Sequence, residues 1–207
     1  MQYKVTAQEV SAAKTPHHIF NVNVILTHLA ISQVALEIGN GSPLNFILLP
    51  IISITVISYL YFKSKKLLQE DSWFVAAHWT LAWRRGRILI ISYIVASVIM
   101  GLTILLGSIF GGGLMMNDFS TDGTSTPIHE KITMFLSAVI VFFTLLVMFL
   151  QEGISVYDAG KGIIDPSITK YAPRDENANE ALEENNNPVA DATPQKESIP
   201  ATKTESK

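Results

Sequence analysis

The 207-residue sequence contains no cysteine and few charged residues. Without cysteine there are no disulfides, thiolate nucleophiles, iron–sulfur clusters or covalently attached c-type haem. Charged residues make up 16% of the chain, against roughly 25% in typical soluble domains. The net charge of −3 comes largely from the C-terminal tail, and no basic surface indicates a nucleic acid as a partner.

Catalytic motifs are also lacking. The sequence has no Walker loop, nucleophile elbow, HExxH or GxGxxG. The triplet Gly111-Gly112-Gly113 follows an apolar segment rather than a soluble strand, so it is a poor phosphate cradle. These observations predict no catalytic residue and favour a non-enzymatic role.

Long apolar blocks are what the sequence does have. Apolar residues make up 48% of the chain, and a bilayer core about 30 Å thick is crossed by about 20 helical residues. The apolar segments at about 88–110 and 132–150, which we call segments three and four, lack the polar face of a soluble core helix. The pattern predicts an all-α integral membrane protein with four transmembrane helices, at about 19–38, 44–62, 88–110 and 132–150.

The rest of the chain divides around this predicted domain, 19–153. A polar segment, 1–18, precedes it, and a cytoplasmic loop, 63–87, interrupts it. A membrane-proximal segment, 154–173, follows. The tail, 174–207, has almost no large apolar residues and cannot bury enough surface to offset its ordering entropy, so we expect it to be disordered.

Basic residues predict the orientation of the helices. The loop between segments two and three carries Lys63, Lys65, Lys66, Arg84, Arg85 and Arg87, whereas 39–43 has no Lys or Arg and 111–131 has only Lys131. Cytoplasmic loops of membrane proteins carry such an excess. We therefore expect both termini in the cytoplasm, in a bacterial inner membrane. The alternative has segment one on the membrane surface, three spans and an external N-terminus.

An aromatic and basic stretch stands in the cytoplasmic loop. Ser72 or Asp71 is a suitable N-cap for a helix that starts at Trp73. Tryptophan rings and basic side chains favour the headgroup level of a membrane, so we predict an interfacial helix that contacts lipid or a partner through Trp73, Trp79, Trp83, Arg84, Arg85 and Arg87. Because no proline separates it from segment three, the two could also form one helix.

The histidines are the candidate ligands for a metal or haem. His28 lies near the middle of segment one and His129 at the outer edge of segment four, so no pair shares a mid-membrane depth. His17 or His18 could approach His78, but no completing metal ligand is evident. The sequence predicts no metal site and no cofactor, and a b-type haem stays as an alternative.

His28 is the most informative of these residues, because an ionisable group at mid-membrane is costly and usually faces protein or water. Asn21, His28 and Ser32 share one helical face, and Glu37 lies near the outer end of segment one. One interpretation is hydrogen bonding that holds the helices together. The other is a path for protons or a substrate.

Small residues predict where segment three packs against another helix. Ser97, Gly101 and Ser108 share one face, and Gly107 and Gly111 form a GxxxG pair. Small side chains let helix backbones approach closely in a membrane.

Together these features favour a non-catalytic small subunit or assembly factor of a larger inner-membrane complex, in contact with lipid and with other membrane proteins in a hetero- or homo-oligomer. A small transporter or proton-conducting component that uses His28 is the first alternative. A haem or quinone redox protein is the second.

Overall fold

The computed structural model describes residues 2–38, 47–70, 72–110, 115–116 and 126–173. Within these ranges the fold is helical apart from a ladder of two-residue strands, β1 (Met115–Met116) and β2 (Thr126–Pro127). The all-α fold class is therefore confirmed. The predicted disordered tail and Gly111 lie outside the described residues.

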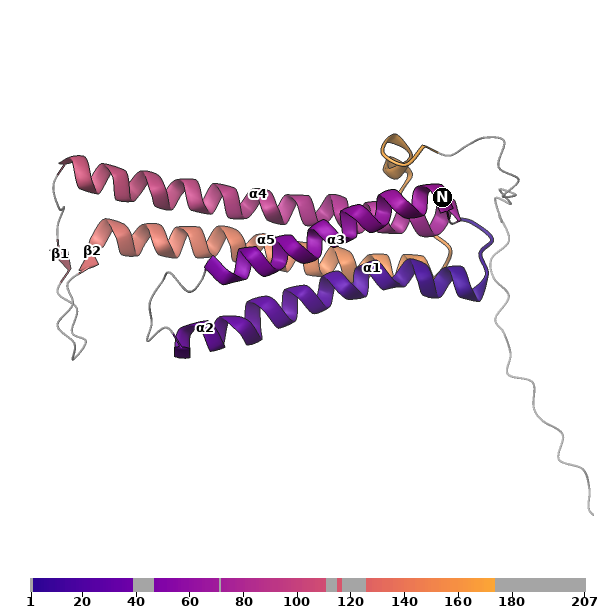
Figure 1. Cartoon of the computed structure of the whole chain (residues 1–207), viewed down its shortest axis with the longest axis horizontal. Helices are drawn as coiled ribbons and strands as arrows, with labels where there is room; N and C mark the ends of the chain where they lie inside the picture. The colour runs from indigo at the N-terminus through magenta and orange to yellow at the C-terminus, as the bar shows by residue number, and fades with distance from the viewer. Residues whose placement is uncertain (1, 39–46, 71, 111–114, 117–125, 174–207) are drawn as a thin grey trace, which may run out of the picture.

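Four long helical rods lie side by side (Figure 1). The first is continuous through α1 (Ala7–Ile25), a π-helical segment η1 (Leu26–Ile31) and α2 (Ser32–Ile38). The others are α3 (Leu48–Glu70), α4 (Trp73–Phe110) and α5 (Ile128–Gly160), followed by a short 3-10 helix η3 (Pro166–Lys170). α4 packs against α3 and α5, and α1 packs against α4 and α5.

The first rod begins well before the predicted apolar segment. Thr6 caps α1: the Glu9 backbone N–H donates to Thr6 Oγ1 at 3.2 Å, and the Thr6 N–H donates to Glu9 Oε2 at 2.8 Å. This reciprocal capping box satisfies two backbone donors that a helix start leaves open. Most of the predicted polar segment 1–18 is therefore helix.

The predicted cytoplasmic loop 63–87 is also helical. α3 ends at Glu70 and α4 begins at Trp73, next to Ser72, whose hydroxyl accepts from the Val75 N–H at 3.4 Å. The first half of α4 replaces the predicted separate interfacial helix, and the side chains of residues 74–82 are buried. Small residues such as Ala76, Ala77 and Ala82, each 0% exposed, let neighbouring helices cover this stretch.

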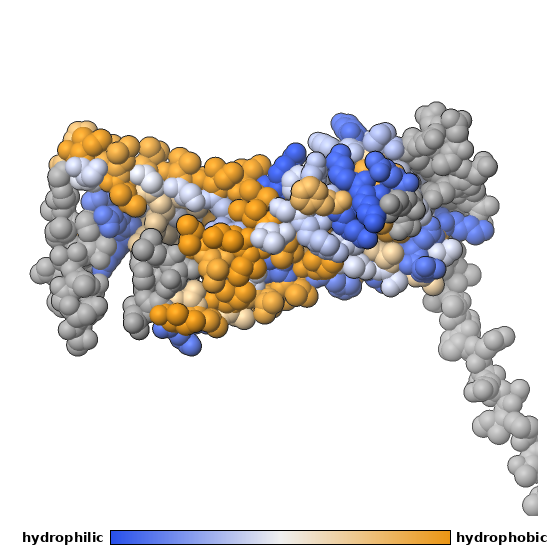
Figure 2. Space-filling view, in the orientation of Figure 1, coloured by the Kyte–Doolittle hydropathy of each residue, from blue (hydrophilic) through white to orange (hydrophobic). Residues whose placement is uncertain are grey.

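Three helices of the described chain are long and apolar enough to cross a membrane: Ala7–Ala35, Trp73–Phe110 and Ile128–Gly160. Large apolar side chains stay exposed along α4 and α5, among them Leu105, Phe110, Phe135 and Phe142. Figure 2 shows this apolar surface over the half of the bundle that includes the ends of α4 and α5 near β1 and β2. Exposed apolar surface of this extent indicates a membrane location.

The opposite half, which we call the polar end, contains a core of its own. Tyr3, Phe74, Leu81, Ile164 and Ile168 are buried together there. The N-terminal residues are tied to the chain that follows α5, because the Tyr3 N–H donates to the Gly162 carbonyl at 2.8 Å. The polar end is therefore a packed extension of the bundle, and it holds the candidate site.

Candidate functional site

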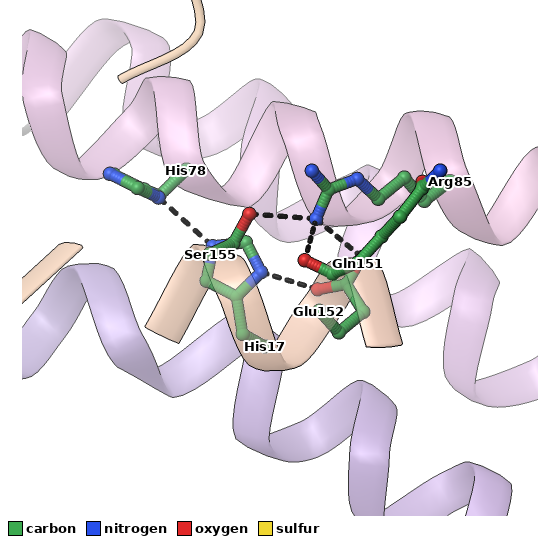
Figure 3. Close-up of polar contacts among 6 residues, drawn as sticks. All are labelled: His17, His78, Arg85, Gln151, Glu152 and Ser155. Atoms are coloured by element: carbon green, nitrogen blue, oxygen red, sulfur yellow. Dashed lines mark hydrogen bonds and ion pairs between the residues drawn. The ribbon is translucent and has the colours of Figure 1, made fainter. Parts of the chain in front are cut away.

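Three helices bring polar side chains together inside the polar end (Figure 3). His17 comes from α1, and His78 and Arg85 come from α4. We call the group the buried polar cluster; it consists of His17, His78, Arg85, Gln151, Glu152 and Ser155. His17, His78 and Glu152 are each 0% exposed, and buried polar groups of this kind are stable only with partners.

His17 is at the centre of the cluster. Its Nδ1 contacts Glu152 Oε2, and its Nε2 lies 2.9 Å from His78 Nδ1. An ionised carboxylate can only accept, so His17 Nδ1 carries the proton that is donated to Glu152. The His17 ring thus joins Glu152 on α5 to His78 on α4.

Arg85 supplies a cation beside Glu152. Its Nη1 lies 3.4 Å from Glu152 Oε1, and it donates to the Ser155 hydroxyl at 2.7 Å and to the Gln151 carbonyl at 2.8 Å. Glu152 therefore has a hydrogen-bonding partner from α1 and a cationic partner from α4. Removal of either partner would leave part of a buried charge uncompensated.

His78 completes the cluster, and the Ile163 backbone also acts on its ring. Its Nε2 is buried and has no hydrogen-bond partner among the described residues. His78 precedes the apolar stretch 88–110 on α4, so it lies outside the membrane-spanning part. Burial, reinforced by the neighbouring His17, lowers the pKa of His78 to about 3. The ring is therefore neutral at physiological pH.

His28 makes a different set of contacts, on the membrane side of the cluster. Its Nδ1 lies 3.3 Å from the Val24 carbonyl, and its Nε2 contacts the Tyr93 hydroxyl on α4. The carbonyl requires a proton on Nδ1, so Nε2 accepts the Tyr93 O–H. Both ring nitrogens thus have partners without any charge on the ring.

A second set of polar contacts, among three side chains, lies near His28. Asn23 Nδ2 donates to Ser53 Oγ on α3 at 3.0 Å, and the Thr27 hydroxyl donates to Asn23 Oδ1 at 3.0 Å. Asn23, Thr27 and Ser53 are buried, and the Asn23–Ser53 bond joins the first rod to α3 inside the bundle. The sequence analysis did not single out these three side chains as a network.

An apolar layer separates His28 from the buried polar cluster. Phe20, Ile57 and Leu89 are each 0% exposed and belong to one core cluster. A Cβ added at Gly86 would lie 2.8 Å from Ile57 Cγ2 and 3.4 Å from Phe20 Cε2, so the glycine lets these helices meet closely. No hydrogen-bonded chain of described residues crosses this layer.

The other intramembrane candidates do not join His28 in one site. Asn21 is half-buried, and its Oδ1 has no partner within the described chain. The Ser32 hydroxyl donates to the His28 carbonyl at 2.7 Å, which is a local helix contact. Glu37 is exposed near the end of α2. A shared helical face alone therefore does not make these residues a common path.

The small-residue face of α4 points outward. Ser97, Gly101 and Ser108 are exposed, and a Cβ at Gly101 would meet no atom within 4 Å. At Gly107 the added Cβ would lie 3.0 Å from His129 Nε2, so this glycine does face α5. Most of the predicted packing face is thus unused within the described chain.

The three tryptophans pack against protein. Trp79 is 4% exposed and lies in the bundle core. Trp83 is partly buried, with its ring centroid 4.7 Å from that of Tyr61. Trp73 Nε1 donates to the Ala172 carbonyl at 3.0 Å. Burial of Trp79 in particular differs from the predicted headgroup contact.

The three arginines of the same stretch have different environments. The Arg84 guanidinium lies 3.6 Å from the centroid of the Tyr171 ring, a cation–π contact. Arg85 belongs to the buried polar cluster, and Arg87 is exposed. Among the predicted basic contacts, Arg87 is thus the most accessible to lipid or a partner.

The described histidines do not gather into a three-ligand metal group. No group of three or more His, Asp or Glu side chains is arranged to hold a metal ion in the described part of the chain. His18 is exposed, and the His17 and His78 rings are hydrogen-bonded with centroids 5.2 Å apart. Two rings in direct contact leave no space for a haem between them.

The sequence analysis missed Glu152 and Ser155. Segment four was expected to end at Leu150, but α5 continues to Gly160. Gly153 is exposed and has open space around it, so it leaves the helix intact. The available signal was the carboxylate of Glu152, which follows shortly after an apolar run. A chain rarely buries a carboxylate without a cationic partner.

No protein-family model, curated protein or solved structure matches this chain.

We expect the free energy of unfolding to depend on the charge of His78. Its pKa is about 3 in the folded chain and about 6.5 when unfolded. Between these values the unfolded chain binds the extra proton, so stability falls as the pH decreases through this window. From pH 7.5 to pH 5.5 the loss should be about 1.4 kcal/mol greater for the wild type than for His78→Gln.

Denaturant unfolding in detergent at the two pH values measures this difference. His18→Gln is the matched control, because His18 is exposed on the same end of the bundle. Equal pH dependence in the wild type and His78→Gln would contradict the neutral, buried state of His78.

Proposed function

We propose that this chain is a non-catalytic small subunit or assembly factor of a larger complex in a bacterial inner membrane. The observation that carries the proposal is the outward small-residue face of α4, formed by Ser97, Gly101 and Ser108. Lipid tails are as apolar as these helices, so association in a membrane depends on close backbone packing and on interhelical hydrogen bonds. A glycine with open space over it suits a partner helix.

The closed interior supports a structural role over conduction. His28 has partners at both ring nitrogens, and Phe20, Ile57 and Leu89 separate it from the buried polar cluster. A proton path needs a chain of groups that exchange hydrogen bonds, and an apolar layer interrupts such a chain. The polar side chains are therefore better suited to hold the helices in register.

We further propose four membrane crossings with both termini in the cytoplasm. α3 runs back along α4 between the two ends of the bundle (Figure 1), as the return of the chain from α2 to α4 requires. The basic residues Lys63, Lys65 and Lys66 gather near the end of α3, in keeping with a cytoplasmic location.

The topology is tested by single-cysteine labelling, for which the cysteine-free chain is suited. We expect Ser11→Cys and Lys65→Cys, both at exposed positions, to react from the cytoplasmic side. Gly41→Cys and Thr124→Cys should react from the opposite side, since positive loops stay inside. Labelling of Lys65→Cys and Gly41→Cys from one side would contradict four crossings.

The subunit proposal is tested at Gly101. Gly101→Leu should leave the melting temperature of the isolated chain within about 2 °C of wild type, because the side chain enters open space. It should abolish a complex that purifies in mild detergent, because the added bulk prevents close helix contact. The measurement is native purification with identification of the co-purifying proteins.

Leu106→Phe is the control for this test. Leu106 is exposed on α4 and points to a different side of the helix from Gly101. A larger side chain at Leu106 should therefore leave the complex intact. A wild-type chain that purifies alone, or a Gly101→Leu chain that keeps its partners, would refute the proposal.

Proton conduction through His28 is the second candidate. One observation favours it: His28 lies in the π-helical segment Leu26–Ile31, and π-helical turns are frequent at functional sites. A histidine that is fully hydrogen-bonded in its neutral form favours the structural role instead.

We expect the structural role of His28 to prevail in a direct comparison of two variants. His28→Gln keeps hydrogen-bonding capacity and should assemble like wild type, whereas His28→Leu strands the buried Tyr93 hydroxyl and should destabilise the fold by about 1–3 kcal/mol. Reconstituted wild-type and His28→Gln proteins should show the same proton flux across liposomes. A flux present in wild type and absent from His28→Gln would establish the conduction hypothesis.

A further inference from the structure

Two arginines share the outward face of α4, where the helix leaves the polar end. Arg84 and Arg87 are three residues apart, and helical residues at this spacing are neighbours on one face. Gly86, between them in the sequence, faces inward against Ile57 and Phe20. The pair therefore projects from the surface of the bundle and does not belong to the buried polar cluster.

The hydrogen-bonding groups of this pair are not used by the protein. Neither arginine forms a hydrogen bond or a salt bridge within the described chain. Arg87 is exposed, whereas the half-buried Arg84 has its guanidinium 3.6 Å from the centroid of the Tyr171 ring. The ring holds this guanidinium in place through its face and accepts no conventional hydrogen bond from it. Both side chains thus keep donors for an external acceptor.

One acidic side chain acts on the same face without neutralising it. The Ser167 backbone N–H lowers the pKa of Asp165, and the charges of Arg85 and Arg84 add to this effect. Asp165 is therefore ionised, and its charge is shared between two arginines. Arg87 has no such partner in the described chain, so the outward face keeps a net positive charge.

The outward face becomes apolar one turn further along α4. Ile91, Ile94 and Val98 are exposed there, and they continue the line of the two arginines at helical spacing. Exposed aliphatic side chains on a membrane helix contact the acyl chains of lipids. The face thus presents cations first and a hydrocarbon surface directly after them.

Aromatic side chains indicate that the membrane boundary lies at the height of the arginines. The Tyr61 ring on α3 contacts Trp83, the neighbour of Arg84, and Phe62 is exposed beside it. On α5, the exposed Tyr157 lies within one turn of the buried polar cluster. Aromatic rings favour the headgroup level, and Figure 2 shows the surface changing from hydrophobic to hydrophilic along the bundle.

We propose that Arg84 and Arg87 bind the phosphate of an anionic phospholipid whose acyl chains lie along the aliphatic part of the same face. A phospholipid carries its phosphate directly above its hydrocarbon chains, which is the order of groups on this face. Guanidinium groups form charge-assisted hydrogen bonds with phosphate oxygens, frequently in pairs. A zwitterionic lipid fits less well, because its own cation is repelled by the positive face.

The lipid site is independent of the subunit proposal. The small-residue face formed by Ser97, Gly101 and Ser108 lies about a quarter of a turn around α4 from the line of the arginines. A partner helix on one face therefore leaves the other open to lipid, and each proposal can fail without the other.

The test is lipid binding to the full chain in mild neutral detergent, measured by native mass spectrometry. Dioleoyl phosphatidylglycerol is the anionic probe, and dioleoyl phosphatidylcholine has the same phosphate and acyl chains but adds a cation. We expect the anionic lipid to bind about tenfold more tightly, because two guanidinium groups meet a net negative headgroup.

Glycerol phosphate distinguishes a lipid site from a site for a free phosphate compound. It offers the phosphate without acyl chains, so it cannot use the aliphatic part of the face. A large excess of glycerol phosphate should therefore leave bound phosphatidylglycerol in place. Displacement of the lipid by this soluble headgroup would overturn the proposal.

Two variants locate the site. Arg87→Gln and Arg84→Gln should each weaken phosphatidylglycerol binding about tenfold, since each removes a charge-assisted contact with the phosphate. The affinity for phosphatidylcholine should change less. Arg87 is exposed and forms no hydrogen bond in the described chain, so Arg87→Gln should keep the melting temperature of wild type. This variant answers even if Arg84→Gln, which loses the Tyr171 contact, fails to fold.

Lys65→Gln is the charge-matched control. Lys65 is exposed on α3 at the same end of the bundle, so its loss changes the net charge as Arg87→Gln does. This variant should bind phosphatidylglycerol within about twofold of wild type, because the phosphate contacts are intact. An equal loss in Lys65→Gln and Arg87→Gln would reduce the site to general charge attraction and refute the proposal. Equal affinity of wild type for the two lipids would also refute it, and is the result expected if an acidic protein covers these arginines.

Discussion

The interaction on which the polar end depends is the burial of the Glu152 carboxylate between His17 and Arg85. A fully buried carboxylate is costly unless cations and donors surround it, and here they come from two other helices. α1, α4 and α5 can satisfy the charge together only when their axial positions match. The ion cluster therefore restricts how these helices slide along one another, which apolar packing alone does weakly.

From this constraint the interior acquires a layered order. The buried polar cluster lies at the polar end, the apolar layer of Phe20, Ile57 and Leu89 comes next, and the His28 and Tyr93 contact follows inside the membrane half. Both polar layers join the first rod to α4, and the apolar layer lies between them. Beyond them, α4 and α5 continue as an apolar pair whose small-residue face has no partner in the described chain.

Much of the helical arrangement follows from the apolar blocks, as the agreement of segments three and four with α4 and α5 illustrates. The helix ends do not, since Trp73–Arg87 and Gln151–Gly160 are polar enough to end an apolar segment. Neighbouring helices nevertheless bury 74–82 in the first range and Glu152 and Ser155 in the second. The start of α1 was available in the sequence, because Thr6 and Glu9 have capping-box spacing. The environment of Trp79, in contrast, could not be predicted from the sequence. Its ring suits either a membrane surface or a protein core, and the neighbouring helices decide between them.

The sequence by itself determined that the chain is helical and suited to a membrane, because bilayer thickness is read along one dimension as the length of an apolar run. It also marked His28 as a residue that needs a partner. Only the tertiary structure decided the site, because His17 and Glu152 are 135 residues apart and meet through the packing of α1 against α5. Hydrogen bonding and charge compensation act across a few ångströms in space, so the linear order of residues does not reveal which groups will share them.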